Sequence, residues 1–498
     1  MKCANIFSDN MVLQRNKPIR FFGTCPEDCK FVKVSVSPLS VTAEAVIRDG
    51  KWEAVLPPMP ACDCCLVQVL SDSKCRFFTN VAVGEVWLAG GQSNMEYELQ
   101  NEKTGREELE VCEKENVRFY YTPKVATVGD ELLKAESETV WQTASAENSG
   151  NWSAVGYYFA KELSRRLGCT VGIVGCNWGG TSASAWIPRE TIESRESLLP
   201  YLEEYDKAVA GKSDEEMIRE YREYQEYDRQ WFIRSRKVYE EKPDAEWEEV
   251  CAICGENRYP GPMNIANPMR PCGLYETMVS RICPYTLKGV LWYQGESDDH
   301  RPDTYSDLLT SLIGCWREKW QDASMPFMVV QLPMHRYKND PDNGNWAKIR
   351  QAQRDVSERL ENVGLAVAID CGEFNNIHPI EKKRVAHRLC IAALEKTYST
   401  DCPNERYPEL TGCVKAEGRL VLKFSRNLVP AEDPEGFMLC IDGEYVPAYP
   451  EISGNTAVFN VNPDSVSAVS YLWTNYCQVN LFGENGLPVP PVRRSLVD

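Results

Sequence analysis

The chain lacks any long hydrophobic run and has fewer positive than negative charges. No stretch approaches the roughly 20 apolar residues that a membrane-spanning helix requires. The 55 lysines and arginines are outnumbered by 73 aspartates and glutamates, which gives a formal net charge of −18. The missing apolar run argues against a membrane protein. Because phosphate binding needs clustered basic residues, the negative charge argues against a nucleic-acid partner and a polyanionic substrate. The N-terminus also lacks the apolar core of a signal peptide, so we expect a cytoplasmic protein.

Histidine is scarce as well. Only four histidines occur among 498 residues, namely His300, His335, His378 and His387. A serine hydrolase must therefore draw its general base from these four side chains. The scarcity makes the position of each histidine informative.

Cysteine, in contrast, is abundant, with 21 residues. Two clusters, at residues 62–65 and 251–254, have no second, matching pair at the spacing of a structural zinc site. We interpret the cysteines as reduced thiols that act as small hydrophobic side chains. Neither a metal nor an organic cofactor is expected.

The chain is too long for one average domain, and its pattern changes twice. Residues 1–80 alternate short apolar and polar runs with turn signals, which predicts an N-terminal β-sandwich. Residues 81–400 alternate buried strands with amphipathic helices, which predicts an α/β domain with a mostly parallel sheet. Residues 401–498 return to a β pattern and predict a C-terminal β-rich domain. Within the central part, residues 191–249 are highly charged and nearly free of glycine, so we expect a helical insertion there.

The central region supplies the elements on which the site prediction depends. Its expected strands are 81–89, 170–177, 289–293, 327–332 and 364–370, and its expected helices are 154–166, 304–320 and 382–397. In open α/β sheets, ligands bind at the carboxyl ends of the strands. The loops that follow these strands are therefore where functional residues are expected.

A serine follows the first of these strands, within the pentapeptide GQSNM at residues 91–95. Flanking glycine and a following helix-compatible segment hold Ser93 on a sharp turn at the sheet edge. There its hydroxyl can face a cleft, and nearby backbone N–H groups can hold an oxyanion. The same pattern also fits a serine that merely caps a helix, so the prediction needs the other loops.

Three further loops end at the same edge. His378 lies just after the strand at 364–370 and is the candidate base. The segment NWGGTS at 177–182 has adjacent glycines whose N–H groups could approach a ligand, although a plain tight turn is the simpler alternative. Gln294 and Glu296 follow the strand at 289–293. Four strand-end loops that offer Ser, Gly, Gln and His predict a site for acyl transfer.

At this point the motifs resemble a known family. The segments GEVWLAGGQSNM (84–95), NWGGTSASAW (177–186), GVLWYQGESD (289–298) and IHP (377–379) are similar to those of the sialate O-acetylesterases, within the SGNH (GDSL-type) hydrolase superfamily. The resemblance covers roughly residues 80–400. It implies a flavodoxin-like three-layer α/β/α SGNH hydrolase domain with an N-terminal β-sandwich and a C-terminal β-rich region.

The resemblance also implies roles for individual residues. Ser93 is the nucleophile and His378 the base, and the oxyanion is held by the N–H groups of Ser93 and Gly180 and by the side chain of Gln294. Hydrolysis of O-acetyl esters of sialic acid is the implied reaction. The residues expected to contact the substrate are Gln92, Trp178, Trp292, Glu296 and Arg350.

One position departs from the family pattern. Many of these enzymes have an aspartate three residues before the histidine, whereas this chain has Asn375 there. An amide can orient an imidazole but adds no charge. Glu373 or Asp370 are the alternative partners of His378, and a backbone carbonyl is another.

Two other functions remain as alternatives. An acetylxylan or acetylmannan esterase would use the same groups at the reacting carbonyl, so the motifs do not separate it from a sialate esterase. A non-catalytic glycan-binding relative would bind through the β-rich ends. In each case the partner is an O-acetylated sugar or sialoglycan, and a homodimer is left open.

Overall fold

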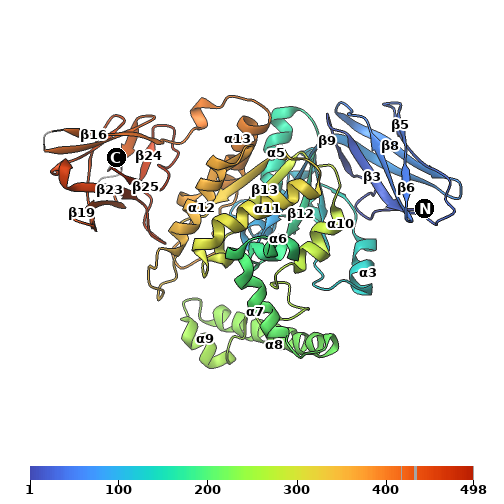
Figure 1. The fold of residues 1–498 in the computed structure, drawn as a ribbon, viewed down its shortest axis with the longest axis horizontal. Coiled ribbons are helices and arrows are strands. Elements are labelled where there is room, and N and C mark those ends of the chain that lie inside the picture. Colours follow the sequence, from blue (N-terminus) through green and yellow to red (C-terminus); the bar gives the residue numbers. More distant parts are fainter. Residues whose placement is uncertain (417, 431–433, 497–498) are drawn as a thin grey trace.

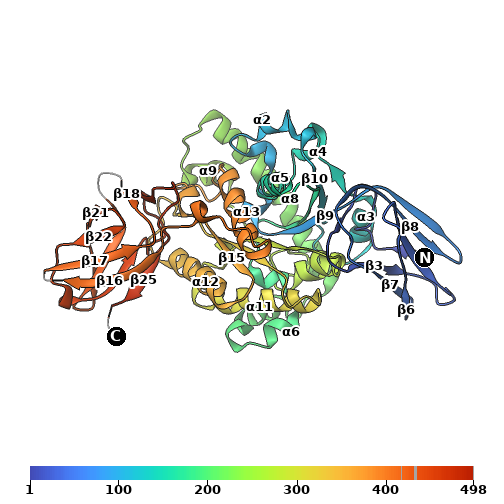
Figure 2. The ribbon, with the colours of Figure 1, turned by 90° about the horizontal axis from the view of Figure 1, so that it is seen from above.

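The computed structural model describes residues 1–416, 418–430 and 434–496. A central body of mixed strands and helices lies between two β-rich ends, with the N-terminal strands at one end and the C-terminal strands at the other (Figures 1 and 2). The mixed α/β class and the extra β-rich regions predicted from the sequence are confirmed. Within the described residues, no helix has both the length and the apolar character needed to cross a membrane.

The central sheet is parallel except at one edge. Across the sheet the parallel strands are β10 (Val117–Tyr121), β12 (Val171–Asn177), β9 (Cys75–Gly91), β13 (Gly289–Tyr293), β14 (Phe327–Gln331) and β15 (Val363–Val367). The short β11 (Gln142–Thr143) pairs with β10 in the antiparallel sense. Every residue of β12 and β13 is buried, as expected for central strands covered on both faces. Because β9 lies between β12 and β13, its carboxyl end faces the loops of both neighbours.

The strand β9 joins the N-terminal region to the central sheet. Its first part pairs antiparallel with β8 (Cys62–Ser71) and parallel with β2 (Val12–Gln14), and its last part pairs with β12 and β13. The boundary predicted between residues 80 and 81 therefore falls inside one continuous strand. The division into three domains stays a prediction.

Four long helices accompany the sheet, and three of them match the predicted ranges. They are α5 (Ala154–Leu167), α11 (Tyr305–Lys319), α12 (Asn345–Arg359) and α13 (Lys383–Thr397). The helix α5 begins after Ser153, whose hydroxyl accepts from the Gly156 N–H, and ends at Gly168 in the left-handed conformation. α5 packs against α13, and α11 packs against α12.

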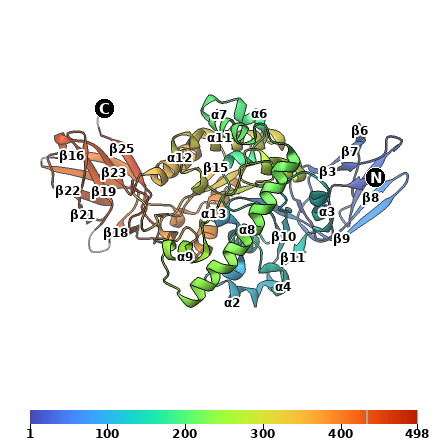
Figure 3. The ribbon, with the colours of Figure 1, turned by 90° about the horizontal axis from the view of Figure 1, so that it is seen from below.

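The predicted insertion is helical. It consists of α7 (Leu199–Val209), α8 (Asp214–Glu241) and α9 (Trp247–Cys254). In Figure 1 these helices project below the central body, and in Figure 3, which is seen from below, α8 crosses in front of it. Most of α8 is exposed or half-buried, and its Trp231 and Val238 pack against Val250 and Cys254 of α9. The charges of this segment therefore lie mainly on a solvated surface.

The two ends consist of short antiparallel strands. The N-terminal strands not yet named are β1 (Lys2–Cys3), β3 (Ile19–Thr24), β4 (Val32–Ser37), β5 (Val41–Glu44), β6 (Val46–Arg48) and β7 (Lys51–Leu56). The larger C-terminal strands are β16 (Leu410–Ala416), β17 (Arg419–Phe424), β19 (Phe437–Ile441), β22 (Thr456–Phe459) and β23 (Val466–Tyr471). The C-terminal strands form a core of their own, which includes Met334, Val367 and Ile369 of the central region.

Candidate active site

Ser93 lies at the carboxyl end of the central strand β9. The strand ends at Gly91, and Ser93 is the first residue of the short helix α1 (Ser93–Glu96). Gly91 has φ +134°, and a Cβ atom there would come within 2.1 Å of the Tyr293 carbonyl oxygen. Only glycine fits this turn, because the backbone of β13 passes so close. The turn therefore holds Ser93 at the sheet edge, as the sequence predicts.

The catalytic pair expected from the sequence is brought together. His378 Nε2 lies 2.8 Å from Ser93 Oγ, although the two residues are 285 positions apart in the chain. The hydroxyl is half-buried and the imidazole faces solvent. A dissolved substrate can therefore reach both groups. The distance is that of a hydrogen bond through which a base can take a proton.

The surroundings of His378 favour the neutral form of its imidazole. Desolvation and the positive charge of Lys382 lower the pKa of His378 below the usual value for histidine, and the Glu96 carboxylate opposes this effect. A neutral imidazole can accept a proton from Ser93 near pH 7. The electrostatics thus fit the role of a base.

None of the three side chains considered as a third member bonds to the imidazole within the described residues. The Asn375 Oδ1 accepts from the Lys338 N–H, and Glu373 accepts from the Asn376 side chain and the Ile380 N–H. Asp370 is paired with Arg388 and Arg384. These groups hold the loop in shape instead. The arrangement is a Ser–His pair.

Two backbone N–H groups at the site are free to bind an oxygen. In the part of the chain that the structure describes, neither the Ser93 N–H nor the Gly180 N–H has a hydrogen-bond partner. Gly180 has φ +74°, a conformation that favours glycine. The neighbouring Gly179 lies close to Ser93, since a Cβ atom on Gly179 would be 3.3 Å from the Ser93 Cβ, and its N–H donates to Glu96 at 2.6 Å. This loop therefore stands beside the reacting hydroxyl.

The third predicted oxyanion donor is already engaged. The Gln294 amide nitrogen donates to the Thr181 carbonyl at 3.2 Å and to Asp298 Oδ2 at 2.6 Å, and the side chain is fully buried. Both of its hydrogens are thus used to hold the loop of residues 181–184. Gln294 would have to release a partner before it could contact an oxyanion.

Asn94 connects the nucleophile turn to the histidine loop, a role that the sequence analysis missed. Its amide nitrogen donates to Glu296 Oε1 at 2.7 Å and to the Ile377 carbonyl at 3.0 Å. Its Oδ1 accepts from the buried ammonium of Lys382 at 2.5 Å. Burial lowers the pKa of Lys382 to about 7 and raises that of Glu296. This small polar network ties the turn that carries Ser93 to the loop that carries His378, and the adjacent Ser93-Asn94 pair was its only sequence signal.

Several predicted substrate contacts lie in the interior, and for them the structure corrects the sequence analysis. Trp292 is fully buried and packs edge-on against Trp186 and Trp316. Arg350 is fully buried, and its guanidinium donates to the backbone carbonyls of Pro333 and Thr474. Neither side chain can reach a dissolved sugar.

Gln92 and Glu296 are also buried, but beside the site. Gln92 accepts from the Ser297 N–H and donates to the Ser297 hydroxyl, which fixes the loop after β13. Glu296 accepts from the Asn94 amide, which joins the loop after β13 to the nucleophile turn. Of the predicted substrate contacts, Trp178 alone is partly exposed.

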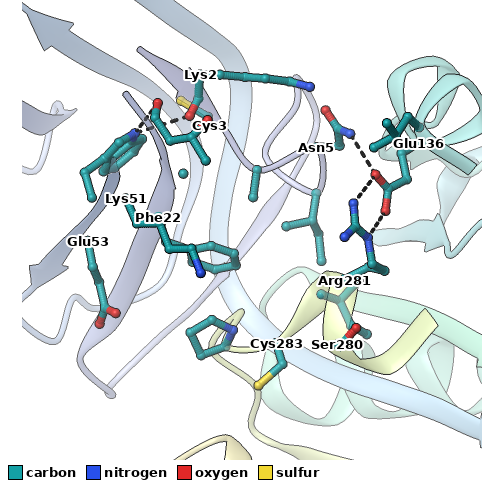
Figure 4. A pocket seen from close by; sticks show the side chains of 18 of the residues that line it. Lys2, Cys3, Asn5, Phe22, Lys51, Glu53, Glu136, Ser280, Arg281 and Cys283 are labelled. Atoms are coloured by element: carbon teal, nitrogen blue, oxygen red, sulfur yellow. Dashed lines mark hydrogen bonds and ion pairs between the residues drawn. The ribbon is translucent and has the colours of Figure 1, made fainter. Parts of the chain in front are cut away.

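A cavity lies away from Ser93 and His378. It has a volume of about 910 Å³ and lies between the N-terminal strands and the central body (Figure 4). Its most prominent polar groups already bind one another, since Glu136 pairs with Arg281 and accepts from Asn5. Neither Ser93 nor His378 lines this cavity. It is therefore separate from the candidate site.

The chain contains no evident metal centre among the residues described. No group of three or more His, Cys, Asp or Glu side chains could hold an ion there, and all of the cysteines are unpaired thiols.

Comparison with known proteins points in the same direction. Residues 259–390 match the family described as carbohydrate esterase, sialic acid-specific acetylesterase. The chain is 26% identical over 484 residues to the sialate O-acetylesterase of Mus musculus, covering 88% of this chain and 83% of the relative. It is 24% identical over 464 residues to the sialate O-acetylesterase of Homo sapiens, covering 84% of this chain and 76% of the relative.

A solved structure matches along the whole length. The crystal structure of a novel carbohydrate acetylesterase from Xanthomonas citri superposes with a TM-score of 0.76 at 25% identity and covers 100% of both chains. The resemblance found in the sequence motifs is confirmed by these matches. The chain is therefore similar in sequence to the sialate O-acetylesterases and in fold to a carbohydrate acetylesterase.

Proposed function

We propose that the chain hydrolyses O-acetyl esters on a carbohydrate through an acetyl-serine intermediate. The single observation that carries this proposal is the 2.8 Å contact between Ser93 Oγ and His378 Nε2 at a solvent-accessible sheet edge. The same contact argues against a non-catalytic glycan-binding protein, because binding alone does not require a nucleophile next to a base.

The reaction has two steps. His378 takes the Ser93 hydroxyl proton while Oγ attacks the acetyl carbonyl, and the Ser93 and Gly180 N–H groups hold the oxyanion. The tetrahedral intermediate collapses as His378 gives the proton to the leaving sugar oxygen. A water molecule, deprotonated by His378, then attacks the acetyl-serine, and acetate leaves as Ser93 regains its proton.

The finer fold proposed for the catalytic domain is the flavodoxin-like three-layer α/β/α arrangement over residues 81–400. It is supported by the parallel order of the sheet, and by the separate packing of α5 with α13 and of α11 with α12. The N-terminal sandwich and the C-terminal β-rich domain complete the proposed layout.

Two substrate classes are candidates. The names of the relatives and the family description indicate O-acetylated sialic acid. A neutral acetylated glycan is favoured by a different observation, the absence of Lys and Arg from the lining of a cavity beside Gly180. Both classes present the same acetyl carbonyl to Ser93.

Release of acetate by the purified chain tests the proposal. The substrates are p-nitrophenyl acetate, 9-O-acetyl-N-acetylneuraminic acid and acetylated xylan, and acetate is measured enzymatically. We expect hydrolysis of p-nitrophenyl acetate and of at least one of the acetylated sugars. Failure to release acetate from any of the three would overturn the esterase proposal.

The pH dependence of the activity should show the lowered pKa of His378. His378 must be neutral to act as the base, and its pKa lies below the usual 6.5. The acid limb of kcat/KM for p-nitrophenyl acetate should therefore fall with an apparent pKa below 6.5, so that activity persists into mildly acidic buffer. His387→Gln is the matched control, because Glu162 and Glu405 raise the pKa of His387, which lies on α13 outside the site. An acid limb centred above 6.5, or one that moves in His387→Gln, would contradict the assignment.

A further inference from the structure

A cavity of about 440 Å³ opens beside the proposed oxyanion loop. Its lining comes from the loop of Gly180, Ser182 and Ser184, from α7, from the segment between residues 259 and 271, and from Ser297 and His300. This volume is within the range of small-molecule sites. Gly180 is thus shared between the cavity and the reacting centre.

The cavity is also joined to the nucleophile on its other side. Ser297 lines it, and the Ser297 hydroxyl accepts from Gln92, the residue directly before Ser93. A ligand bound in the cavity would therefore lie between the two loops that flank Ser93.

Tyrosines form much of its wall. Tyr201 and Tyr205 come from α7, and Tyr259 comes from the segment that follows the insertion. The hydroxyl of Tyr259 lies against Gly180, since a Cβ atom on Gly180 would be 2.1 Å from it. A tyrosine ring offers an apolar face and a polar tip, which suits a sugar ring with its C–H face and its hydroxyl groups.

One of these rings is fixed and two have unused hydroxyls. The Tyr201 hydroxyl donates to the buried carboxylate of Asp298 at 2.8 Å. Within the described residues, the hydroxyls of Tyr205 and Tyr259 make no hydrogen bond, and Tyr259 is 55% exposed. They are therefore available to a ligand without the loss of any internal bond.

The lining has one basic side chain, the imidazole of His300. The lining contains neither lysine nor arginine, and its carboxylate, Glu204, is already paired with Arg301. The chain as a whole carries a formal charge of −18. An anionic sugar entering this cavity would lose hydration without meeting a lysine or an arginine of the lining, whereas an uncharged ring has no such need.

We propose that this cavity binds an uncharged pyranose ring of the acetylated glycan, held by Tyr205 and Tyr259. The inference rests on the proposed esterase function and deepens it by naming the class of sugar beside the ester. It also gives the insertion a role, because α7 supplies one wall of the cavity. Specificity for the glycan then comes from the insertion, and the chemistry comes from the sheet edge.

The kinetic test compares an acetylated xylo-oligosaccharide with p-nitrophenyl acetate, which has no sugar ring. In Tyr205→Ala and Tyr259→Ala, the ratio of kcat/KM for the sugar ester to that for p-nitrophenyl acetate should fall at least tenfold, mainly through KM. Tyr449→Ala is the matched control, because Tyr449 is 71% exposed in the C-terminal region. If the ratio is unchanged in both cavity variants, the proposal is wrong. Tyr259→Ala keeps the test valid should Tyr205→Ala fail to fold, because Tyr259 is exposed.

A binding test separates this proposal from the esterase function. In Ser93→Ala protein, which retains the cavity, xylotetraose and N-acetylneuraminic acid are titrated by calorimetry. We expect xylotetraose to bind at least tenfold more tightly, and Tyr259→Ala to remove that binding. Equal or tighter binding of N-acetylneuraminic acid would overturn the inference even if acetate release by the parent protein supports the esterase. Loss of acetate release with intact xylotetraose binding would overturn the esterase and leave the sugar site standing.

Discussion

Ser93→Ala should reduce hydrolysis of p-nitrophenyl acetate by about 10⁴-fold or more, and His378→Ala should reduce it by a similar amount. The two side chains share one hydrogen bond of 2.8 Å, and neither can perform acyl transfer without the other. Removing the hydroxyl removes the nucleophile. Removing the imidazole leaves a serine hydroxyl of ordinary, weak acidity, which stays protonated near pH 7. The measurement is kcat/KM for each variant on purified protein of matched fold.

The double variant makes the test sharper. If the two groups act as one unit, Ser93→Ala combined with His378→Ala should be no slower than either single variant. His387→Gln, at a histidine outside the site, should retain the parent rate. Multiplicative losses in the double variant, or a His378→Ala variant with near-parent activity, would show that the contact is not the catalytic pair.

The sequence was sufficient for the pair because both residues follow strands of the parallel sheet. Ser93 follows β9 and His378 follows β15, and parallel strands present their carboxyl ends at one edge. Continuous apolar runs such as β13 identified these strands without ambiguity, since they are buried on both faces. The Gly91 turn could also be anticipated, because glycine is required where two backbones approach closely.

Burial of polar and aromatic side chains was harder to predict. Trp292 lies near the end of the strand β13 and Arg350 lies within the helix α12, yet both side chains are buried. Alternation within a strand decides which side a residue faces, but in a fully covered sheet both sides are interior, so Trp292 has no exposed face. Arg350 is buried because the C-terminal region covers it and offers the Thr474 carbonyl, a contact between distant segments that no local pattern discloses.

Two other features depended on tertiary structure. The strand β10 was not predicted, although its Val117–Tyr121 segment is nearly all buried, because no following helix pattern marked it as part of the parallel sheet. The engagement of Gln294 by Asp298 depends on the single short 3₁₀ turn, Glu296–Asp298, in the loop after β13. Motif spacing placed both residues at the site but did not say which partner each would bind.

Asp298→Ala should lower the free energy of unfolding by about 3 kcal/mol and reduce kcat/KM at least tenfold. The Asp298 carboxylate is fully buried and accepts four hydrogen bonds. Its donors are Ser182 Oγ, the Ala183 N–H, the Tyr201 hydroxyl and the Gln294 amide. Removing the acceptor leaves these donors unpaired in the interior, which is costlier than the loss of an exposed bond. Urea unfolding and steady-state kinetics measure the two effects.

The reduced activity has a specific physical cause. Asp298 ties the loop after Gly180 to the end of β13 and to α7, so its removal frees the loop that carries a proposed oxyanion donor. Asp303→Ala is the matched control, because Asp303 is 77% exposed and its pair with Lys348 lies on the surface, where an ion pair contributes at most about 1 kcal/mol. Asp298→Asn should fall between the parent and Asp298→Ala, since an amide keeps one acceptor oxygen but turns a donor toward the remaining donors. An Asp298→Ala protein as stable and active as Asp303→Ala would show that the loop is held by other contacts, and that the position of Gly180 does not depend on this carboxylate.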